Sequence, residues 1–158
     1  RLQHKSWVTE TREADAYSMQ RQLDTLRLFS IMIDCRNRAG ISFSDCRAEA
    51  DQYVQNCMAL EGYTTLAMNR CSSSLIDVYD QILPFEEAQL LAMLAYDPKT
   101  QDLLNIANKK WRDFVKADCE WQWSEFREGT MRGQVYASCM IAHLEVRLLR
   151  VTSSNWSE

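Results

Sequence analysis

The stretch WRDFVKADCEWQWSEFREGTMRGQVYASC, residues 111–139, decides the fold of this chain because it places two cysteines symmetrically about a glycine. Ten positions separate Cys119 from Gly129, and another ten separate Gly129 from Cys139. If one helix runs up to the glycine and another returns from it, the two sulfurs reach the same height on adjacent helices. A disulfide requires Cα atoms roughly 4.4–6.8 Å apart, which such a hairpin can supply. The stretch therefore predicts a helical hairpin closed by a Cys119–Cys139 disulfide.

The other four cysteines complete an even set without any CxxC pair. Six cysteines in a chain of this kind indicate three disulfides and an oxidising compartment. Six cysteines permit 15 pairings, and the sequence leaves the pairs other than Cys119–Cys139 open. Pairing between nearest neighbours is the arrangement we expect, because Cys35 and Cys46 flank one glycine and Cys57 and Cys71 flank another. A zinc site would need closely spaced cysteines and usually histidines. We therefore expect no metal and no cofactor.

Composition limits the class of protein. A chain of 158 residues with 4 glycines and 2 prolines favours one domain of long helices over a β-rich fold with many tight turns. The net charge of −4 disfavours nucleic acid as a partner, and it favours either a cationic partner or no partner, with the charge serving solubility. The longest apolar stretch, residues 26–33, is too short to span a bilayer. The chain begins at Arg1 without an apolar leader, as expected of a secreted or periplasmic protein whose signal peptide has been removed, or of a shortened sequence.

Capping and helix-breaking residues divide the chain into helices. Pro84 marks a boundary because the residue before a proline avoids the helical region, and Asp97–Pro98 is a start signal. The result is an all-α, disulfide-stapled antiparallel bundle of about five to six helices. We expect helices at 9–34, from 42 or 44 to 60, from about 65 to 82, at 85–96, at 97–128 and at 132–151, followed by a frayed tail at 152–158.

Two of these helices carry apolar stripes. In the first, the stripe consists of Ala16, Met19, Leu23, Leu26 and Ile33, with Arg21 and Asp24 away from it. In the helix at 97–128, the apolar face consists of Leu104, Ala107, Trp111, Phe114, Val115 and Trp121.

Trp123 falls nearly opposite the apolar face of that second helix. Either it packs under the N-terminal helix, or it is an aromatic anchor for a partner. In the second case the acidic residues near it would share the contact. The candidate partner-binding residues are Trp123, Glu120, Glu125 and Glu128.

Catalytic patterns are weak. His143 lies among apolar residues of the last helix, no serine sits in a strand-to-helix nucleophile turn, and paired cysteines offer no thiolate. The acidic pairs have the spacing of solvated helix faces. We expect a binding protein and not an enzyme.

The hairpin region resembles the LprI-like family of secreted bacterial proteins, named for a lipoprotein lysozyme inhibitor. The matching residues are Trp111, Phe114, Cys119, the turn at 128–130, Cys139 and Arg147. Weaker likenesses are SFSDC at 42–46 followed by Cys57, and LIDVYDQIL at 75–83, where Ile76 replaces the usual Asn. Cys35 and Cys71 depart from the pattern. The resemblance covers about 42–151, and the chain then divides into an N-terminal helical extension at 1–40, an LprI-like core at 41–151 and the tail.

The resemblance implies a secreted all-α fold and a lysozyme or another cell-wall hydrolase as the target. An acidic chain would be attracted to such a cationic muralytic enzyme. Two alternatives remain: an immunity protein that neutralises a specific toxin delivered to the periplasm, and an envelope protein that binds a small molecule or has a structural role. A deep apolar cavity between helices would favour the last alternative, and a convex ridge of Trp and Glu the first two.

Overall fold

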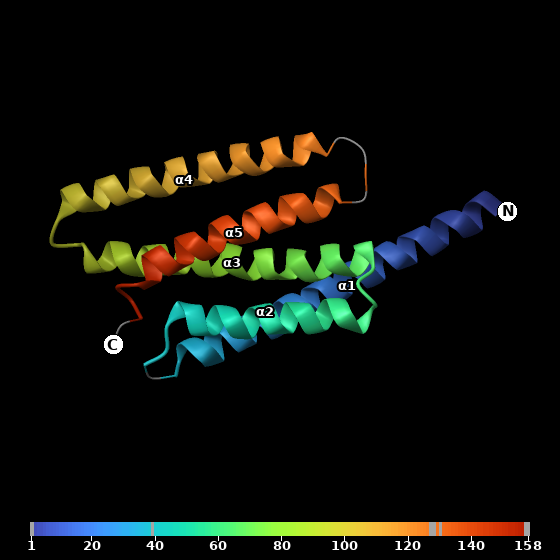
Figure 1. Ribbon diagram of the computed structural model, residues 1–158, viewed down its shortest axis with the longest axis horizontal. Helices are drawn as coiled ribbons and strands as arrows, with labels where there is room; N and C mark the ends of the chain where they lie inside the picture. The colour runs from blue at the N-terminus through green and yellow to red at the C-terminus, as the bar shows by residue number, and fades with distance from the viewer. Residues whose placement is uncertain (1, 39, 127–128, 130, 157–158) are drawn as a thin grey trace.

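The structure is a computed structural model that describes residues 2–38, 40–126, 129 and 131–156, with side chains from residue 13 onward. Over these residues the chain consists of helices and their connecting turns, and helices that follow one another in the sequence run antiparallel (Figure 1). The expectation of an all-α antiparallel bundle is confirmed. The helices are α1 (Leu2–Arg36), α2 (Phe43–Leu60), α3 (Thr65–Met93), α4 (Pro98–Glu125) and α5 (Arg132–Thr152).

Three of the helices begin at side-chain caps that are readable in the sequence. Ser42 and Asp45 form a reciprocal capping box at the start of α2. Thr64 accepts a hydrogen bond from the backbone N–H of Ala67 at the start of α3. Asp97 caps α4 by accepting from the backbone N–H of Thr100 at 3.2 Å. These caps satisfy N–H groups that have no partner within their own helix.

Each disulfide joins two consecutive helices. Cys35–Cys46 links α1 to α2, and Cys57–Cys71 links α2 to α3. Cys119–Cys139 links α4 to α5 with its Cα atoms 5.6 Å apart, inside the range that a disulfide requires. The structure therefore contains the three pairs that the sequence indicates, and it has no free cysteine among the described residues.

The core surrounds α3. Leu75, Val78 and Tyr79 are at most 1% exposed and pack against residues of α1, α2 and α5. Trp156 of the C-terminal tail packs against this core, contrary to the expectation that the tail frays, and residues 157–158 lie outside the described residues. The ring of Trp156 meets Phe43 edge-on with centroids 5.9 Å apart. An aromatic side chain this close to the core gains more from packing than the tail loses in chain entropy.

Helix α3 is continuous through Pro84, so the predicted boundary between two helices is wrong. The carboxylates of Glu86 and Glu87, just after the proline, are buried and paired with Arg36 of α1 and Arg112 of α4. Leu83, just before it, is also buried. Packing on both sides of Pro84 therefore outweighs the local cost of a proline inside a helix.

Helix α1 buries a face other than its apolar stripe. Leu28, Met32 and Cys35 enter the core, whereas Met19 and Leu26 are 64% and 66% exposed. Asp24 belongs to the buried face, at 3% exposure. Its carboxylate accepts hydrogen bonds from Tyr53 of α2 at 2.9 Å and from Arg70 of α3 at 3.3 Å. These two partners offset the cost of burying the carboxylate.

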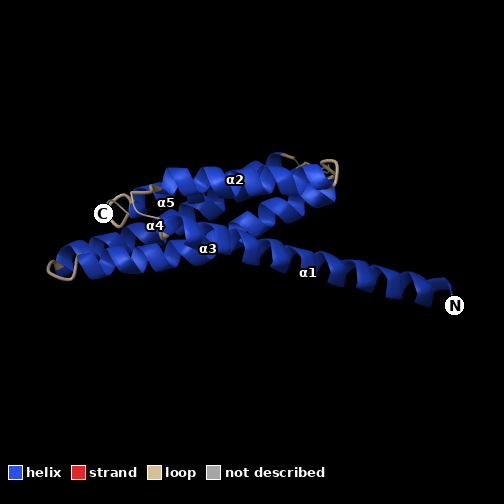
Figure 2. Ribbon diagram, turned by 90° about the horizontal axis from the view of Figure 1, so that it is seen from below, coloured by secondary structure: helices blue, strands red, loops and turns tan. Residues whose placement is uncertain are grey.

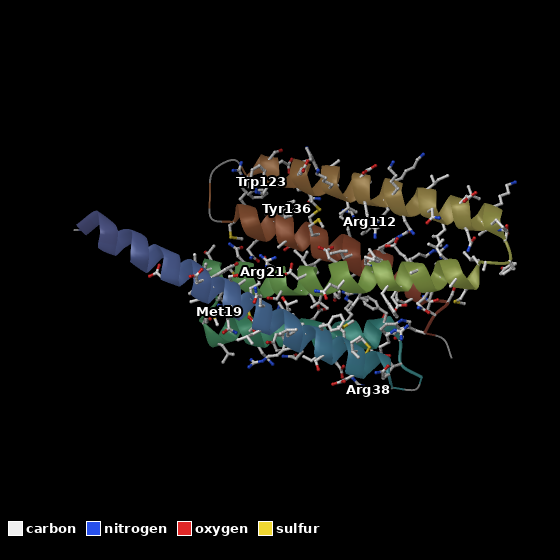
Figure 3. All side chains as sticks on the ribbon, turned by 180° about the vertical axis from the view of Figure 1, so that it is seen from behind. Met19, Arg21, Arg38, Arg112, Trp123 and Tyr136 are labelled. Atoms are coloured by element: carbon white, nitrogen blue, oxygen red, sulfur yellow. A yellow bond between two sulfur atoms is a disulfide. The ribbon has the colours of Figure 1, made fainter. Side chains whose placement is uncertain are left out.

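The first part of α1 extends beyond the body formed by the other helices (Figures 1 and 2). Figure 3 shows Arg21 on the side of α1 that faces α3, where its guanidinium forms two 2.8 Å contacts with Asp77. Met19 lies on the other side of the helix (Figure 3). No helix among the described residues has an 18-residue stretch apolar enough to cross a bilayer.

Candidate protein-binding surface

Helix α4 lies at the edge of the molecule and packs chiefly against α5 (Figure 1). Among its residues, Asn108, Val115 and Cys119 are the buried ones. Polar contacts supplement the disulfide that joins α4 to α5, and the two shortest are these. His143 and Asp118 are 2.6 Å apart, and Arg147 donates to the side-chain oxygen of Asn108 at 2.5 Å. Most of the surface of α4 is therefore left to solvent.

The apolar face expected for α4 is only partly buried. Val115 lies inside and Trp111 is half-buried, but Phe114 and Trp121 are 58% and 59% exposed. The expectation that Trp121 joins the core is wrong because α4 has α5 as its main neighbour, so only a narrow strip of α4 is covered. Phe114 retains one contact, an edge-on approach to the His143 ring at 5.5 Å. Two large aromatic side chains thus remain available to a partner.

Trp123 lies at the end of α4, close to the connection to α5 (Figure 3). Its ring is not under α1. The guanidinium of Arg132 lies 3.6 Å from the ring centroid, and the side chain of Trp123 is 40% exposed. A cation over one face of an indole fixes the ring and leaves the other face available. Of the acidic residues predicted to accompany it, Glu120 and Glu125 are exposed, and Glu128 lies outside the described residues.

The charges on α4 are divided between its two halves. Residues 99–112 carry Lys99, Lys109, Lys110 and Arg112 against Asp102, whereas residues 113–125 carry Asp113, Asp118, Glu120 and Glu125 against Lys116. The first half thus has a net charge of +3 (four basic minus one acidic) and the second of −3 (one basic minus four acidic). This order opposes the helix dipole, which favours acidic residues near the N-terminus and basic ones near the C-terminus. Helix stability therefore does not account for the acidic half.

An open groove adjoins this acidic half on the α5 side, with a volume of about 480 Å³. Its walls combine apolar side chains, among them Phe126 and Met131, with polar ones such as Gln122 and His143. Phe126 and Met131 are 45% and 54% exposed. The tip of the hairpin thus carries aromatic and aliphatic side chains beside carboxylates. Sequence reasoning identified Trp123 but missed Trp121 and Phe126, because an amphipathic pattern places apolar residues on a face without showing how much of it a neighbour covers.

Four potential metal-binding groups meet inside the hairpin. Donor atoms of Asp118, Cys119, Cys139 and His143 all lie within 4.8 Å of one another. The two sulfurs are joined to each other, which leaves one carboxylate and one imidazole as ligands. Structural and catalytic zinc sites use at least three protein ligands. The oxidised cluster therefore stabilises the hairpin and does not form a metal centre.

Chemistry at His143 is limited for a similar reason. Among the hydrogen bonds of the described residues, its imidazole makes a single one, to Asp118. A catalytic histidine of a hydrolase would also contact a nucleophile. Among the described residues, His143 therefore has a carboxylate partner and no nucleophile as a hydrogen-bond partner.

A second concave site lies between α1, α3 and the tail. This cavity has a volume of about 320 Å³ and is lined mainly by apolar side chains, including Phe29, Met32 and Phe85. Arg36 forms part of its wall, with its guanidinium carbon 5.4 Å from the centre of the Phe85 ring. The ion pair between Arg36 and buried Glu86 neutralises the charge there.

The fold and the surface together define a disulfide-linked all-α protein with an exposed helix that carries aromatic and acidic side chains. The sequence profile of the family described as "Lysozyme inhibitor LprI" matches residues 57–150, more than half of the chain. The chain belongs to this lysozyme inhibitor family. No curated protein and no solved structure matched the chain.

The match runs from the end of α2 to the end of α5. It contains the hairpin disulfide and Cys57–Cys71, and excludes α1 together with Cys35–Cys46. The matched range is shorter than the range 42–151 expected from the sequence. The SFSDC segment at 42–46 lies outside the match. The family region is therefore α3, α4 and α5, and α1 with most of α2 is additional to it.

Proposed function

We propose that this chain inhibits a cationic lysozyme-like cell-wall hydrolase by binding it with the acidic half of α4 and the adjoining tip of the hairpin. The observation that carries the proposal is a set of exposed aromatic side chains among carboxylates, on the family-matched part of the chain. Trp121 is 59% exposed, and Glu120 and Glu125 are exposed on the same part of the helix.

Electrostatics support a cationic target. The chain has a net charge of −4, and the second half of α4 alone has a net charge of −3. A concentrated patch of one sign accelerates association with a partner of the opposite sign, and salt weakens the effect. Because the carboxylates are exposed, they affect association without a large desolvation cost.

The tryptophans supply short-range affinity. Tryptophan is enriched among the residues that dominate protein interfaces, since it buries a large area and loses few rotamers. Arg132 already holds the ring of Trp123, so the Trp123 side chain is ordered before a partner binds. The ring of Trp121 has no comparable cation among the described side chains.

The disulfides support a periplasmic or secreted location. Three disulfides among the described residues agree with an oxidising compartment, because cytosolic thiols are kept reduced. Cell-wall hydrolases act outside the cytoplasm as well. Inhibitor and target would therefore meet in the same compartment.

The test is inhibition of muralytic enzymes, measured as loss of cell-wall lysis, with affinity measured by calorimetry. Trp121→Ala and Trp123→Ala should each weaken binding by about 2 kcal/mol, roughly thirtyfold. Leu103→Ala is the matched control, because Leu103 is also 59% exposed but lies in the basic half of α4. It should leave the affinity unchanged.

Charge is tested separately. Glu120→Lys with Glu125→Lys should slow association strongly at 0.1 M salt and weakly at 1 M, where the Debye length falls from about 10 Å to about 3 Å. Asp102→Lys, in the other half of the helix, is the control. The proposal fails if no lysozyme or amidase binds the chain more tightly than about 10 μM, or if the control variants lose as much affinity as the others.

A second candidate function is the binding of a small apolar molecule, which the cavity between α1 and α3 favours. Its volume of about 320 Å³ is at the lower end for ligand sites, and its aromatic lining would suit an acyl chain. Trp156 lines this cavity and provides the signal. Titration with medium-chain fatty acids should change the Trp156 fluorescence, and Phe85→Ala should weaken the change. An unaltered spectrum at millimolar ligand would exclude this function.

A further inference from the structure

The apolar stripe of α1 has the spacing of a coiled-coil seam. Apolar or small residues recur at intervals of three, four, three, four and three positions. This alternation of three and four positions is the seven-residue repeat that keeps one face of a helix against another helix. The residues are Ala16, Met19, Leu23, Leu26, Ser30 and Ile33.

This stripe has no partner within the described part of the chain. Met19, Leu23 and Leu26 are 64%, 46% and 66% exposed. The body of the protein covers the opposite side of the helix, where Leu28 and Met32 are at most 1% exposed. Helix α1 is thus apolar on two opposite faces, and the fold uses one of them.

The surroundings of the stripe favour a second helix over a membrane. Asp15, Arg27 and Asp34 flank the stripe on the helix surface and are exposed. Ionised side chains at these positions suit the solvated edges of a helix pair and are costly beside lipid chains. The helix is also already formed and extends beyond the body, so a partner helix would not have to order it (Figure 2).

We propose that this stripe is the interface of a homodimer, in which α1 of a second copy packs antiparallel along α1. In this register Ala16 faces Ile33 of the second copy, Met19 faces Ser30, and Leu23 faces Leu26. The first two pairings each combine a small residue with a large one, so the layers of the interface have similar volumes. A parallel pair would place Ala16 on Ala16 and Ser30 on Ser30, which leaves voids between layers of paired large residues.

A second copy is the occupant that the stripe itself matches. The intervals along the stripe read the same in both directions. In the antiparallel pair a two-fold axis therefore places each of the six stripe residues opposite another stripe residue, and none is left unpaired. Such self-complementarity is the requirement of a two-fold interface. The dimer goes beyond the proposed function, because α1 lies outside the family match and away from α4.

The experiment measures association by sedimentation equilibrium of the full chain between 5 and 200 μM. We expect a reversible dimer in this range, and Leu26→Glu should weaken its association at least tenfold. Leu60→Glu is the matched control, since Leu60 is 88% exposed but lies on α2, away from the stripe. Circular dichroism checks that both variants keep their helices. A monomer at 200 μM, or equal weakening by the two variants, overturns the proposal.

Orientation is tested with a photo-reactive phenylalanine analogue in place of Met19. In the antiparallel dimer it should cross-link to the second copy near Ser30, and peptide mapping identifies the site. Cross-links centred on residue 19 of the second copy would overturn the antiparallel arrangement. Inhibition of the hydrolase by the Leu26→Glu variant distinguishes the dimer from the proposed function. If the stripe forms the dimer, the monomeric variant still binds the hydrolase. If the variant loses hydrolase binding, the stripe belongs to the hydrolase interface and the dimer proposal fails.

Discussion

Helices α3 and α4 are almost equal in length, with 29 and 28 residues, but twelve residues of α3 are buried and only three of α4. Helix α3 lies at the centre and is contacted by α1, α2 and α5, whereas α4 lies at the edge (Figure 1). Their amphipathic patterns alone do not show this difference. What distinguishes them is how many neighbours cover each helix.

The two helices are therefore held by different interactions. Helix α3 is stabilised by apolar burial around Leu75 and Tyr79. Helix α4 is held by the Cys119–Cys139 bond and by polar contacts such as that of Arg112 with Glu87 of α3. A helix attached in this way can expose most of its surface to a partner without loss of its position.

The largest expected effect is in the core. Leu75→Ala should lower the free energy of unfolding by about 2–5 kcal/mol, because the side chain is 1% exposed and leaves a cavity. Leu103→Ala on α4 should change it by no more than about 0.5 kcal/mol, since Leu103 is 59% exposed. Urea denaturation followed by circular dichroism measures both. Similar losses for the two variants would contradict the contrast between the helices.

Loss of the hairpin disulfide comes next. Cys119→Ser together with Cys139→Ser opens a loop with a sequence separation of 20, and should cost about 3 kcal/mol in the chain-entropy model. The helical circular dichroism should remain nearly unchanged while the melting temperature falls by several degrees. Hydrogen exchange should show faster exchange in α4 than in α3, because α4 has less packing to hold it.

The matched comparison is Cys57→Ser with Cys71→Ser, which removes the bond between α2 and α3. Here packing should keep the two helices in contact, so any increase in exchange should be spread over the body. If the hairpin variant also loses protection evenly, α4 is not the separately attached element inferred here.

A third effect depends on pH and concerns the side of α5 that faces the body. Burial, and secondly the charge of Asp51, raises the pKa of Glu145 from 4.5 to about 7. Arg47 contacts both carboxylates, so one guanidinium serves two negative charges. Because the folded pKa is the higher one, the folded state holds the proton more strongly. The stability from this group is complete below about pH 4.5 and is lost as pH rises through 7.

We therefore expect the free energy of unfolding to fall by about 2–3 kcal/mol between pH 4.5 and pH 8 through Glu145, at 1.36 kcal/mol per pKa unit. Glu145→Gln should flatten this dependence, while Glu120→Gln on the exposed part of α4 should leave it intact. Urea titrations at several pH values provide the measurement. The same dependence of stability on pH in the natural chain and in Glu145→Gln would contradict the raised pKa.

Local features of the sequence account for much of the fold. The disulfide pairs could be predicted because each pair flanks a glycine-marked turn, and the caps at Ser42 and Asp97 mark helix starts by short-range hydrogen bonds. These interactions depend on residues within a few positions of each other, or within one hairpin. Such information is present in the sequence order itself.

The choice between two apolar faces could not be predicted in this way. Helix α1 presents Met19 and Leu26 on one side and Leu28 and Met32 on the other, and either could enter a core. Burial of the second face depends on Asp24, whose carboxylate is satisfied by residues 29 and 46 positions away. In the same way, the exposure of Trp121 follows from the position of α4 at the edge. Both outcomes depend on long-range contacts that a single sequence does not reveal.

The smallest expected effect is at Pro84. It tests directly whether the packing of α3 outweighs the low preference of proline for the interior of a helix. A proline inside a helix costs about 3 kcal/mol relative to alanine, because it lacks the N–H that would bond the carbonyl of Asp80 and its ring crowds that carbonyl. Part of the cost is offset because proline also restricts the unfolded chain, by about 1 kcal/mol. Pro84 is exposed, so alanine removes little packing. Pro84→Ala should therefore stabilise the protein by about 1–2 kcal/mol in urea denaturation, and Gln81→Ala, at an exposed position one turn earlier, should change stability by less than about 0.5 kcal/mol. If Pro84→Ala destabilises the chain instead, then the backbone geometry that proline favours at this position is itself needed for the burial of Glu86 and Glu87.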